Sequence, residues 1–194
     1  MRLIVVDGLD GSGKDTHAER IRTLLESEGT RVILVSHPSK RFFGRMSKRF
    51  LRGTGSVARF FATLFFTADI LWSVRWLKGV EGETVIFVRY LMGTAYLPRH
   101  LAPFGYRFFR KYLPFPDLAL FIDIEPKVAM RRIAARGLAH EMFETLDKLE
   151  AMRKVAQQLA SSEWVTVDNS EDGKGPFREV ERLLRERSML RPAV

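Results

Sequence analysis

The 194-residue sequence contains no cysteine. Disulfide bonds and thiolate-ligated metals are therefore excluded, and the composition is compatible with a reducing compartment. No charged leader followed by an apolar core begins the chain, and no window looks apolar enough to span a bilayer. We therefore expect a cytoplasmic protein without a membrane partner.

Acidic residues are too few to balance the basic ones. Thirty-two Lys and Arg against 23 Asp and Glu give a formal net charge of +9 and a sequence pI of about 10.2. Such an excess attracts nucleotides, nucleic acids or anionic lipids, and charge alone does not choose among them. Much of it lies in residues 40–59, which either flank an anionic ligand or form a solvated helix face. Because no nucleic-acid-reading module is recognisable, a nucleic-acid partner is not expected.

Short apolar runs alternate with helical segments along the whole chain. Strands are predicted at 2–7, 31–35, 84–88, 118–124 and 164–168, and helices at 16–28, 41–51, 56–77, 126–136, 143–160 and 176–187. Because the strands are apolar on both faces, the pattern predicts a three-layer α/β fold, with a five-stranded parallel sheet and helices on both faces. No linker interrupts it, so residues 1–194 are predicted to form a single domain.

The segment GLDGSGKDT at residues 8–16 matches Gly-x4-Gly-Lys between the first strand and the first helix. Glycine permits backbone conformations in which successive N–H groups turn toward one anion, and the helix adds the positive end of its dipole. The ammonium group of Lys14 should reach the terminal phosphates. We therefore predict that the phosphates of ATP bind to Gly8, Asp10, Gly11, Ser12, Gly13, Lys14, Asp15 and Thr16.

Asp15 stands where such loops usually carry a Ser or Thr that binds Mg²⁺ through its hydroxyl. A carboxylate binds Mg²⁺ readily, although it also repels phosphate. Asp15 is therefore the candidate metal ligand, and ATP and Mg²⁺ are the expected cofactors.

Several sequence segments favour a small-molecule kinase over other phosphate-loop proteins. No Asn-Lys-x-Asp motif that would read guanine is present, and no apolar run ends in paired carboxylates. In order and over most of the chain, the remaining segments resemble the thymidylate kinase family: DGLDGSGKDT at 7–16, FFTAD at 65–69, VRY at 88–90, PDL at 116–118, FIDI at 121–124 and RIAARG at 132–137.

The resemblance implies a P-loop kinase that transfers a phosphoryl group from ATP to a nucleoside monophosphate, with dTMP the leading acceptor. It also implies a lid over about 132–146 and a homodimer, formed through the aromatic-rich helix at 60–76. The implied catalytic residues are Lys14, Arg89, Arg132 and Arg136. The implied acceptor-binding residues are Asp10, His37, Phe66, Arg89, Tyr90 and Tyr96.

The chain departs from the family pattern in four places. Val88 replaces an Asp, Ile70 replaces an Arg that reads the base, Ser36-His37-Pro38 replaces Arg-Glu-Pro, and the lid lacks its usual Asp-Arg at 141–144. Asp15 could supply the carboxylate that is lost at residue 88. Two alternatives stay open: a kinase for another nucleotide or small phosphorylated metabolite, and an ATP-binding protein that has lost catalysis.

Overall fold

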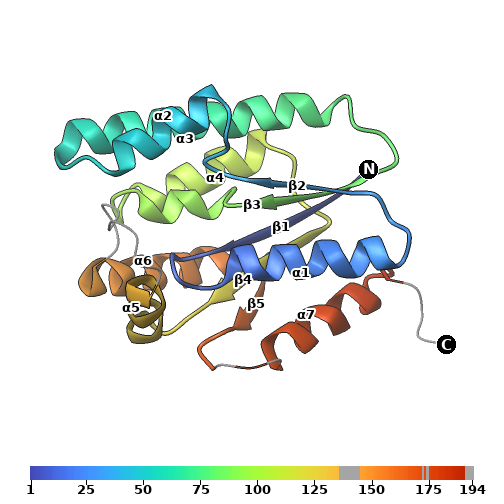
Figure 1. Cartoon of the computed structure of the whole chain (residues 1–194). Coiled ribbons are helices and arrows are strands. Elements are labelled where there is room, and N and C mark those ends of the chain that lie inside the picture. Colours follow the sequence, from blue (N-terminus) through green and yellow to red (C-terminus); the bar gives the residue numbers. More distant parts are fainter. Residues whose placement is uncertain (136–144, 172, 174, 191–194) are drawn as a thin grey trace.

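The structure is a computed structural model that describes residues 1–135, 145–171, 173 and 175–190. Five parallel strands form one sheet in the order β2-β3-β1-β4-β5 (Figure 1). They are β1 (Arg2–Gly8), β2 (Val32–Ser36), β3 (Thr84–Val88), β4 (Leu118–Asp123) and β5 (Val165–Asp168). The predicted sheet is therefore confirmed.

Helices cover both faces of this sheet (Figure 1). One face carries α1 (Lys14–Ser27) and α7 (Gly175–Glu186). The other face carries α3 (Gly55–Leu77), α4 (Ala102–Tyr112) and α6 (Leu146–Ala160). The remaining helices are α2 (Phe42–Leu51), which packs against α3, and α5 (Pro126–Ala135), which follows β4.

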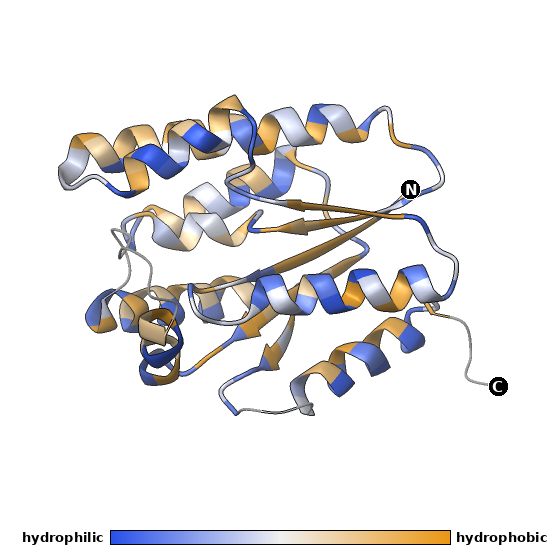
Figure 2. Cartoon of the chain, viewed as in Figure 1, coloured by the Kyte–Doolittle hydropathy of each residue, from blue (hydrophilic) through white to orange (hydrophobic). Residues whose placement is uncertain are grey.

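The two apolar sides of each strand serve two separate cores. In β1, Leu3 and Val5 pack toward α3, α4 and α6, whereas Ile4 and Val6 pack toward α1 and α7. Successive side chains of a strand point to opposite faces, so a strand buried on both faces must be apolar throughout. The hydrophobic strands between more mixed helices are visible in Figure 2.

The sequence predicts no helix or strand between β3 and β4, yet this segment contains a short 3₁₀ helix, η1 (Met92–Tyr96), and α4. Pro103 and Gly105, residues that usually interrupt helices, stand near the start of α4 and mask its helical signal in the sequence. Tyr106 is buried, whereas Phe104 and Phe108 are exposed.

The expectation that no segment is apolar enough to span a bilayer is wrong for α3. Its 23 residues pass that test by length and composition, with a mean hydropathy of 1.4, and only 22% of the apolar window is buried. The same helix places Ile70 and Leu77 in the core that covers the sheet. Length and composition therefore do not distinguish a membrane span from a long surface helix here.

Parallel strands bring their carboxyl ends to one edge of the sheet, where ligands of open α/β sheets bind. Val6 of β1 pairs with Val88 of β3, which in turn pairs with Ser36 of β2. The phosphate loop, the Arg89 segment and the His37 segment therefore leave the sheet side by side.

Candidate active site

The phosphate loop is held in a conformation that requires glycine. Gly11 and Gly13 have φ of 80° and 83°, the left-handed region that side chains disfavour. A Cβ atom at Gly11 would also lie 2.7 Å from the carbonyl oxygen of Ala129 in α5. Ser12 is fully buried, and its hydroxyl has no hydrogen-bond partner among the described residues. The tight loop thus aims the start of α1 at the carboxyl edge of the sheet.

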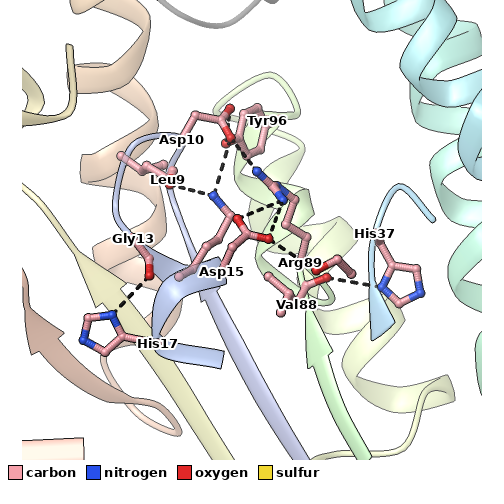
Figure 3. A network of polar contacts seen from close by, with 11 residues as sticks. Leu9, Asp10, Gly13, Asp15, His17, His37, Val88, Arg89 and Tyr96 are labelled. Atoms are coloured by element: carbon pink, nitrogen blue, oxygen red, sulfur yellow. Dashed lines mark hydrogen bonds and ion pairs between the residues drawn. The ribbon is translucent and has the colours of Figure 1, made fainter. Parts of the chain in front are cut away.

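Lys14 and Asp10 form a buried pair at this loop. The Lys14 ammonium donates to the carbonyl oxygen of Leu9 at 2.8 Å and lies 3.5 Å from the Asp10 carboxylate (Figure 3). Burial lowers the pKa of Lys14, and the neighbouring Arg89 lowers it further. Burial alone would raise the pKa of Asp10, but Lys14 and Arg89 outweigh it and hold that pKa well below its usual value. Asp10 is therefore ionised.

Arg89 joins the pair from the end of β3. One terminal nitrogen of its guanidinium group donates to Asp10 at 3.1 Å, and the other lies 3.4 Å from Asp15 (Figure 3). Burial opposes ionisation, yet the two carboxylates raise the pKa of Arg89 above its usual value. Its φ of 59° is unusual for a residue other than glycine. This backbone turn directs the side chain from the strand end toward the phosphate loop.

Next to these charges lies a cavity of about 240 Å³. Its charged end is lined by Asp10, Asp15 and Arg89, and the Tyr96 hydroxyl donates to Asp10 at 3.1 Å. Burial raises the pKa of Tyr96 well above its usual value, so the hydroxyl keeps its proton. Phe66 and Ala62 also line the cavity. The cavity therefore has both charged and apolar lining residues.

His37 is buried at the cavity wall and is neutral. The Val88 carbonyl accepts from the His37 backbone N–H at 2.9 Å and lies 3.3 Å from Nδ1, which therefore carries the ring hydrogen. The other ring nitrogen, Nε2, is 2.8 Å from the Ser73 hydroxyl. Burial lowers the pKa of His37 to about 4. His37 thus contacts the carbonyl group of Val88, the residue that precedes Arg89.

The loop that follows His37 is anchored from α3. The Asp69 carboxylate, fully buried, accepts from the backbone N–H of Ser39 at 2.6 Å and from its hydroxyl at 2.7 Å. The segment FFTAD therefore has two physical roles, because Phe66 lines the cavity while Asp69 fixes the loop that forms one of its sides.

The remaining predicted site residues fall in different places. Gly8 and His37 line the cavity, whereas Thr16 is exposed on α1. Tyr90 is only 2% exposed, packs in the core and donates its hydroxyl to the carbonyl oxygen of Pro114 at 3.1 Å, so the structure does not bring it to the cavity. Arg132 lies half-buried in α5, close enough to His17 to lower that residue's pKa. Arg136 and most of the expected lid at 132–146 lie outside the described residues.

Several residues that line the cavity were not singled out from the sequence. Asp7, at the end of β1, accepts from the backbone N–H groups of Tyr90 and Met92 at 2.8 and 3.1 Å, and burial raises its pKa. Ser47 and Lys48 of α2 and Thr63 of α3 also line the cavity. The basic run at 40–59 was the available signal for Lys48, but a run does not reveal which of its cations lies beside the cavity.

The sequence and the fold of this chain are similar to those of known proteins. A family model described as thymidylate kinase matches residues 6–179. The chain is 32% identical to a thymidylate kinase of Xanthomonas campestris, covering 94% of this chain and 82% of that protein. It is 31% identical to a putative thymidylate kinase of Aeropyrum pernix, covering 90% and 88%. A thymidylate kinase structure from Candida albicans, 19% identical, superposes with a TM-score of 0.78 over 96% of this chain and 92% of that one.

The chain belongs to the thymidylate kinase family. It is a P-loop nucleoside monophosphate kinase, and the fold, the ordered sequence segments and the buried charge cluster agree with that assignment. The predictions of family, fold class and kinase activity are confirmed.

Two departures from the family pattern now have a structural description. Ile70 of α3 is 5% exposed, and its side chain packs into the core that covers one face of the sheet. Val88 is fully buried, and its carbonyl oxygen accepts a hydrogen bond from the backbone N–H of His37. Among the described residues, no group of three or more His, Cys, Asp or Glu side chains is arranged to hold a metal ion. Mg²⁺ is usually bound by one or two protein ligands together with phosphate oxygens and water, and such binding needs no cluster of this kind.

Proposed function

We propose that this enzyme transfers the γ-phosphoryl group of ATP to dTMP, giving dTDP and ADP. The observation that carries the proposal is the convergence of Lys14 and Arg89 on Asp10, at the mouth of a cavity walled by Phe66. In this assignment the ammonium group of Lys14 meets the phosphates of ATP, and the fork of Arg89 grips the phosphate of the acceptor. Catalysis then comes from alignment and charge neutralisation, without a covalent intermediate.

The acceptor would lie along the cavity with its phosphate at Arg89. The Asp10 carboxylate and the Tyr96 hydroxyl would then meet the sugar, and the Phe66 ring would stack on the base; all three line the cavity. Lys48 lines the cavity and can only donate hydrogen bonds, so it favours base carbonyl groups over amino groups. Thymine has two such carbonyl groups, whereas cytosine has one and adenine none, and this supports thymine despite Ile70. Arg132 and Arg136 remain the proposed lid arginines.

An assay of ADP release with ATP, Mg²⁺ and a panel of nucleoside monophosphates tests the proposal. Turnover with dTMP far above that with dCMP and AMP is the expected result. Preferred turnover with another nucleotide would replace the acceptor while keeping the kinase. ATP binding measured by calorimetry without turnover on any acceptor would identify a protein that has lost catalysis.

For Mg²⁺, we infer that Asp15 is the protein's ligand. Its side chain is 55% exposed at the charged end of the cavity and accepts from the Ser36 hydroxyl at 3.2 Å. A bound Mg²⁺ would screen the charge of the phosphates during transfer. Because Asp15 is also an Arg89 partner, ATP with its metal would compete for Asp15 and leave Arg89 free for the acceptor.

Replacing Asp15 with Ala should raise the Mg²⁺ concentration needed for half-maximal turnover by roughly 10-fold, because the carboxylate contact is lost. Asp15→Ser, which restores a hydroxyl ligand, should recover part of that loss. Glu19→Ala, which removes an exposed carboxylate from the same helix, is the control. A Mg²⁺ titration of Asp15→Ala that matches the unaltered enzyme would overturn the assignment.

We further propose a cytoplasmic homodimer. The side of α3 turned away from the sheet exposes large apolar residues with few charges between them, as an obligate interface does. They are Val57, Phe60, Leu64, Leu71, Trp72 and Trp76.

A further inference from the structure

Asn169 lies directly after β5, and its side chain reaches the phosphate loop. The side-chain amide donates a hydrogen bond to the carbonyl oxygen of Ser12 at 2.7 Å, across a separation of 157 residues. The approach is close, because a Cβ atom added at Gly13 would lie 2.7 Å from the amide nitrogen of Asn169. The amide therefore joins the end of β5 to the middle of the phosphate loop.

The backbone that carries Asn169 is itself fixed. Its N–H donates to the carbonyl oxygen of Asp123, at the end of β4, at 2.9 Å. The next residue, Ser170, donates its backbone N–H to the Asp168 carboxylate at 2.9 Å. The Ser170 hydroxyl also accepts from the backbone N–H of Glu125 at 2.9 Å. The Asn169 amide thus extends from a short loop that is hydrogen-bonded to the ends of two strands.

The peptide groups on the two sides of Gly13 are held by different partners. The Gly13 carbonyl accepts from the backbone N–H of His17 at 2.9 Å and lies 3.1 Å from its ring Nδ1, in the first turn of α1 (Figure 3). The Ser12 carbonyl stands one residue before this turn, and Asn169 is the partner that the described residues provide for it. The helix therefore fixes one peptide group, and Asn169 fixes the other.

The direction of the Ser12 carbonyl also decides where the next N–H points. A trans peptide group carries its C=O and N–H on opposite sides, so the Gly13 N–H points away from Asn169. In this direction it can join the N–H groups at the start of α1 in binding one anion. Gly13 has a φ of 83°, and because glycine permits both signs of φ, the Ser12–Gly13 peptide group could also turn over. The Ser12 carbonyl would then face the phosphates and repel them.

We propose that Asn169 is a positioning residue for the phosphate loop, whose amide keeps the Gly13 N–H turned toward the phosphates of ATP. The proposal rests on the proposed binding of ATP at this loop and is independent of the acceptor. The cavity assigned to the acceptor is lined by neither Asn169 nor Ser12. Because Asn169 acts through the backbone, it affects every polyphosphate that the loop binds, whether or not a base and a sugar are attached.

Calorimetric titration with ATP and with inorganic tripolyphosphate, each in the presence of Mg²⁺, tests the proposal on the full-length protein. Asn169→Leu keeps the approximate size of the side chain but removes its amide, so both ligands should bind roughly 5- to 10-fold more weakly. Asn169→Gln keeps an amide on a longer side chain and should recover part of the affinity. At saturating ATP, KM for the acceptor should change by less than about 2-fold.

A matched variant controls for the loss of an amide elsewhere. Gln158→Leu makes the same kind of change at an exposed position of α6 and should bind both ligands as the unaltered protein does. Urea unfolding shows whether each variant is folded. If Asn169→Leu does not fold, Asn169→Ala removes the amide without adding apolar bulk, and the same losses are expected for it.

Three results would overturn the proposal. One is weaker binding of ATP with unchanged binding of tripolyphosphate, which would assign Asn169 to the base or the sugar of the nucleotide. Another is unchanged affinity for both ligands. The third is a rise in KM for the acceptor as large as the loss of ATP affinity, which would indicate that the whole site is distorted. If no acceptor is turned over, the proposed phosphoryl transfer fails, while the two titrations still decide the role of Asn169.

Discussion

At the scale of single residues, the site is governed by competition for Asp10 and Asp15. Arg89 contacts both carboxylates, with separations of 3.1 and 3.4 Å. Lys14 shares Asp10 from the other side. Phosphate oxygens entering the site offer the same cations a second set of acceptors. The protein's carboxylates therefore hold the cations in place until substrates replace them.

Arg89→Lys tests the role of the guanidinium fork. A lysine keeps the charge but cannot make two parallel hydrogen bonds, so kcat/KM for dTMP should fall by roughly 100-fold. The affinity for ATP, measured by calorimetry, should change little. Arg99→Lys, at an exposed position, serves as the control. Equal kinetics for Arg89→Lys and the unaltered enzyme would remove Arg89 from acceptor binding.

His37 makes folding stability depend on pH. Its pKa is about 4 in the folded protein against 6.5 in the unfolded chain, so its contribution is complete above pH 6.5 and is lost as pH falls toward 4. At pH 5 the loss should be about 2 kcal/mol, since the unfolded chain binds the proton that the buried ring refuses. Burial also lowers the pKa of His17, which adds to the same trend.

Urea unfolding at pH 7 and pH 5 measures this effect. In His37→Gln the loss of stability between the two pH values should shrink by about 2 kcal/mol relative to the unaltered protein. His100→Gln, which changes an exposed histidine, should leave the difference as it is. A pH dependence that is identical in His37→Gln and the unaltered protein would show that His37 is not held neutral.

At the scale of elements, the cavity depends on how closely η1 approaches α3. A Cβ atom on Gly93 of η1 would lie 2.7 Å from the Phe66 ring. Gly93→Ala should displace that ring and raise KM for dTMP by roughly 3- to 10-fold, with KM for ATP unchanged. Gly79→Ala is the matched control, because its added Cβ would meet only ordinary contacts. Steady-state kinetics with each substrate varied in turn measures both KM values. An unaltered KM for dTMP in Gly93→Ala would contradict the predicted displacement of the Phe66 ring.

The layered sheet explains why the site tolerates the losses at residues 70 and 88. The inner positions of α3 and β3 serve the two cores, so an apolar residue there strengthens packing. The residues proposed to contact phosphate lie beyond the strand ends, in the phosphate loop and at Arg89. Departures from a family pattern inside elements therefore matter less to phosphate binding than departures in these loops.

At the scale of the whole molecule, α3 exposes an apolar side that includes Phe60, Leu64 and Trp72. Leu64→Glu/Trp72→Glu places charges in that surface and should convert a dimer into monomers at micromolar concentration. Light scattering coupled to size exclusion measures the mass. Arg178→Glu, at an exposed position of α7 on the other face of the sheet, should leave the mass unchanged. A single-chain mass for the unaltered protein would contradict the dimer directly.

The sequence alone was sufficient for the five strands, for the helices other than η1 and α4, for the parallel sheet and for the phosphate loop. These features depend on local periodicity and on glycines, which act through their immediate neighbours. It could not show that Tyr90 packs inward or that α4 exists with rings on both sides. Such outcomes depend on which side of an element meets the core.

The pairing of Arg89 with Asp15, 74 residues apart, was decided by the tertiary structure. So was the burial of His37 against Val88. Each of these contacts forms because parallel strands end at one edge of a sheet and their loops then share a small volume. The sequence by itself determined the elements and the phosphate-binding loop, since both follow from short-range rules. The partners that each loop meets were decided by the fold, because only the strand order places them side by side.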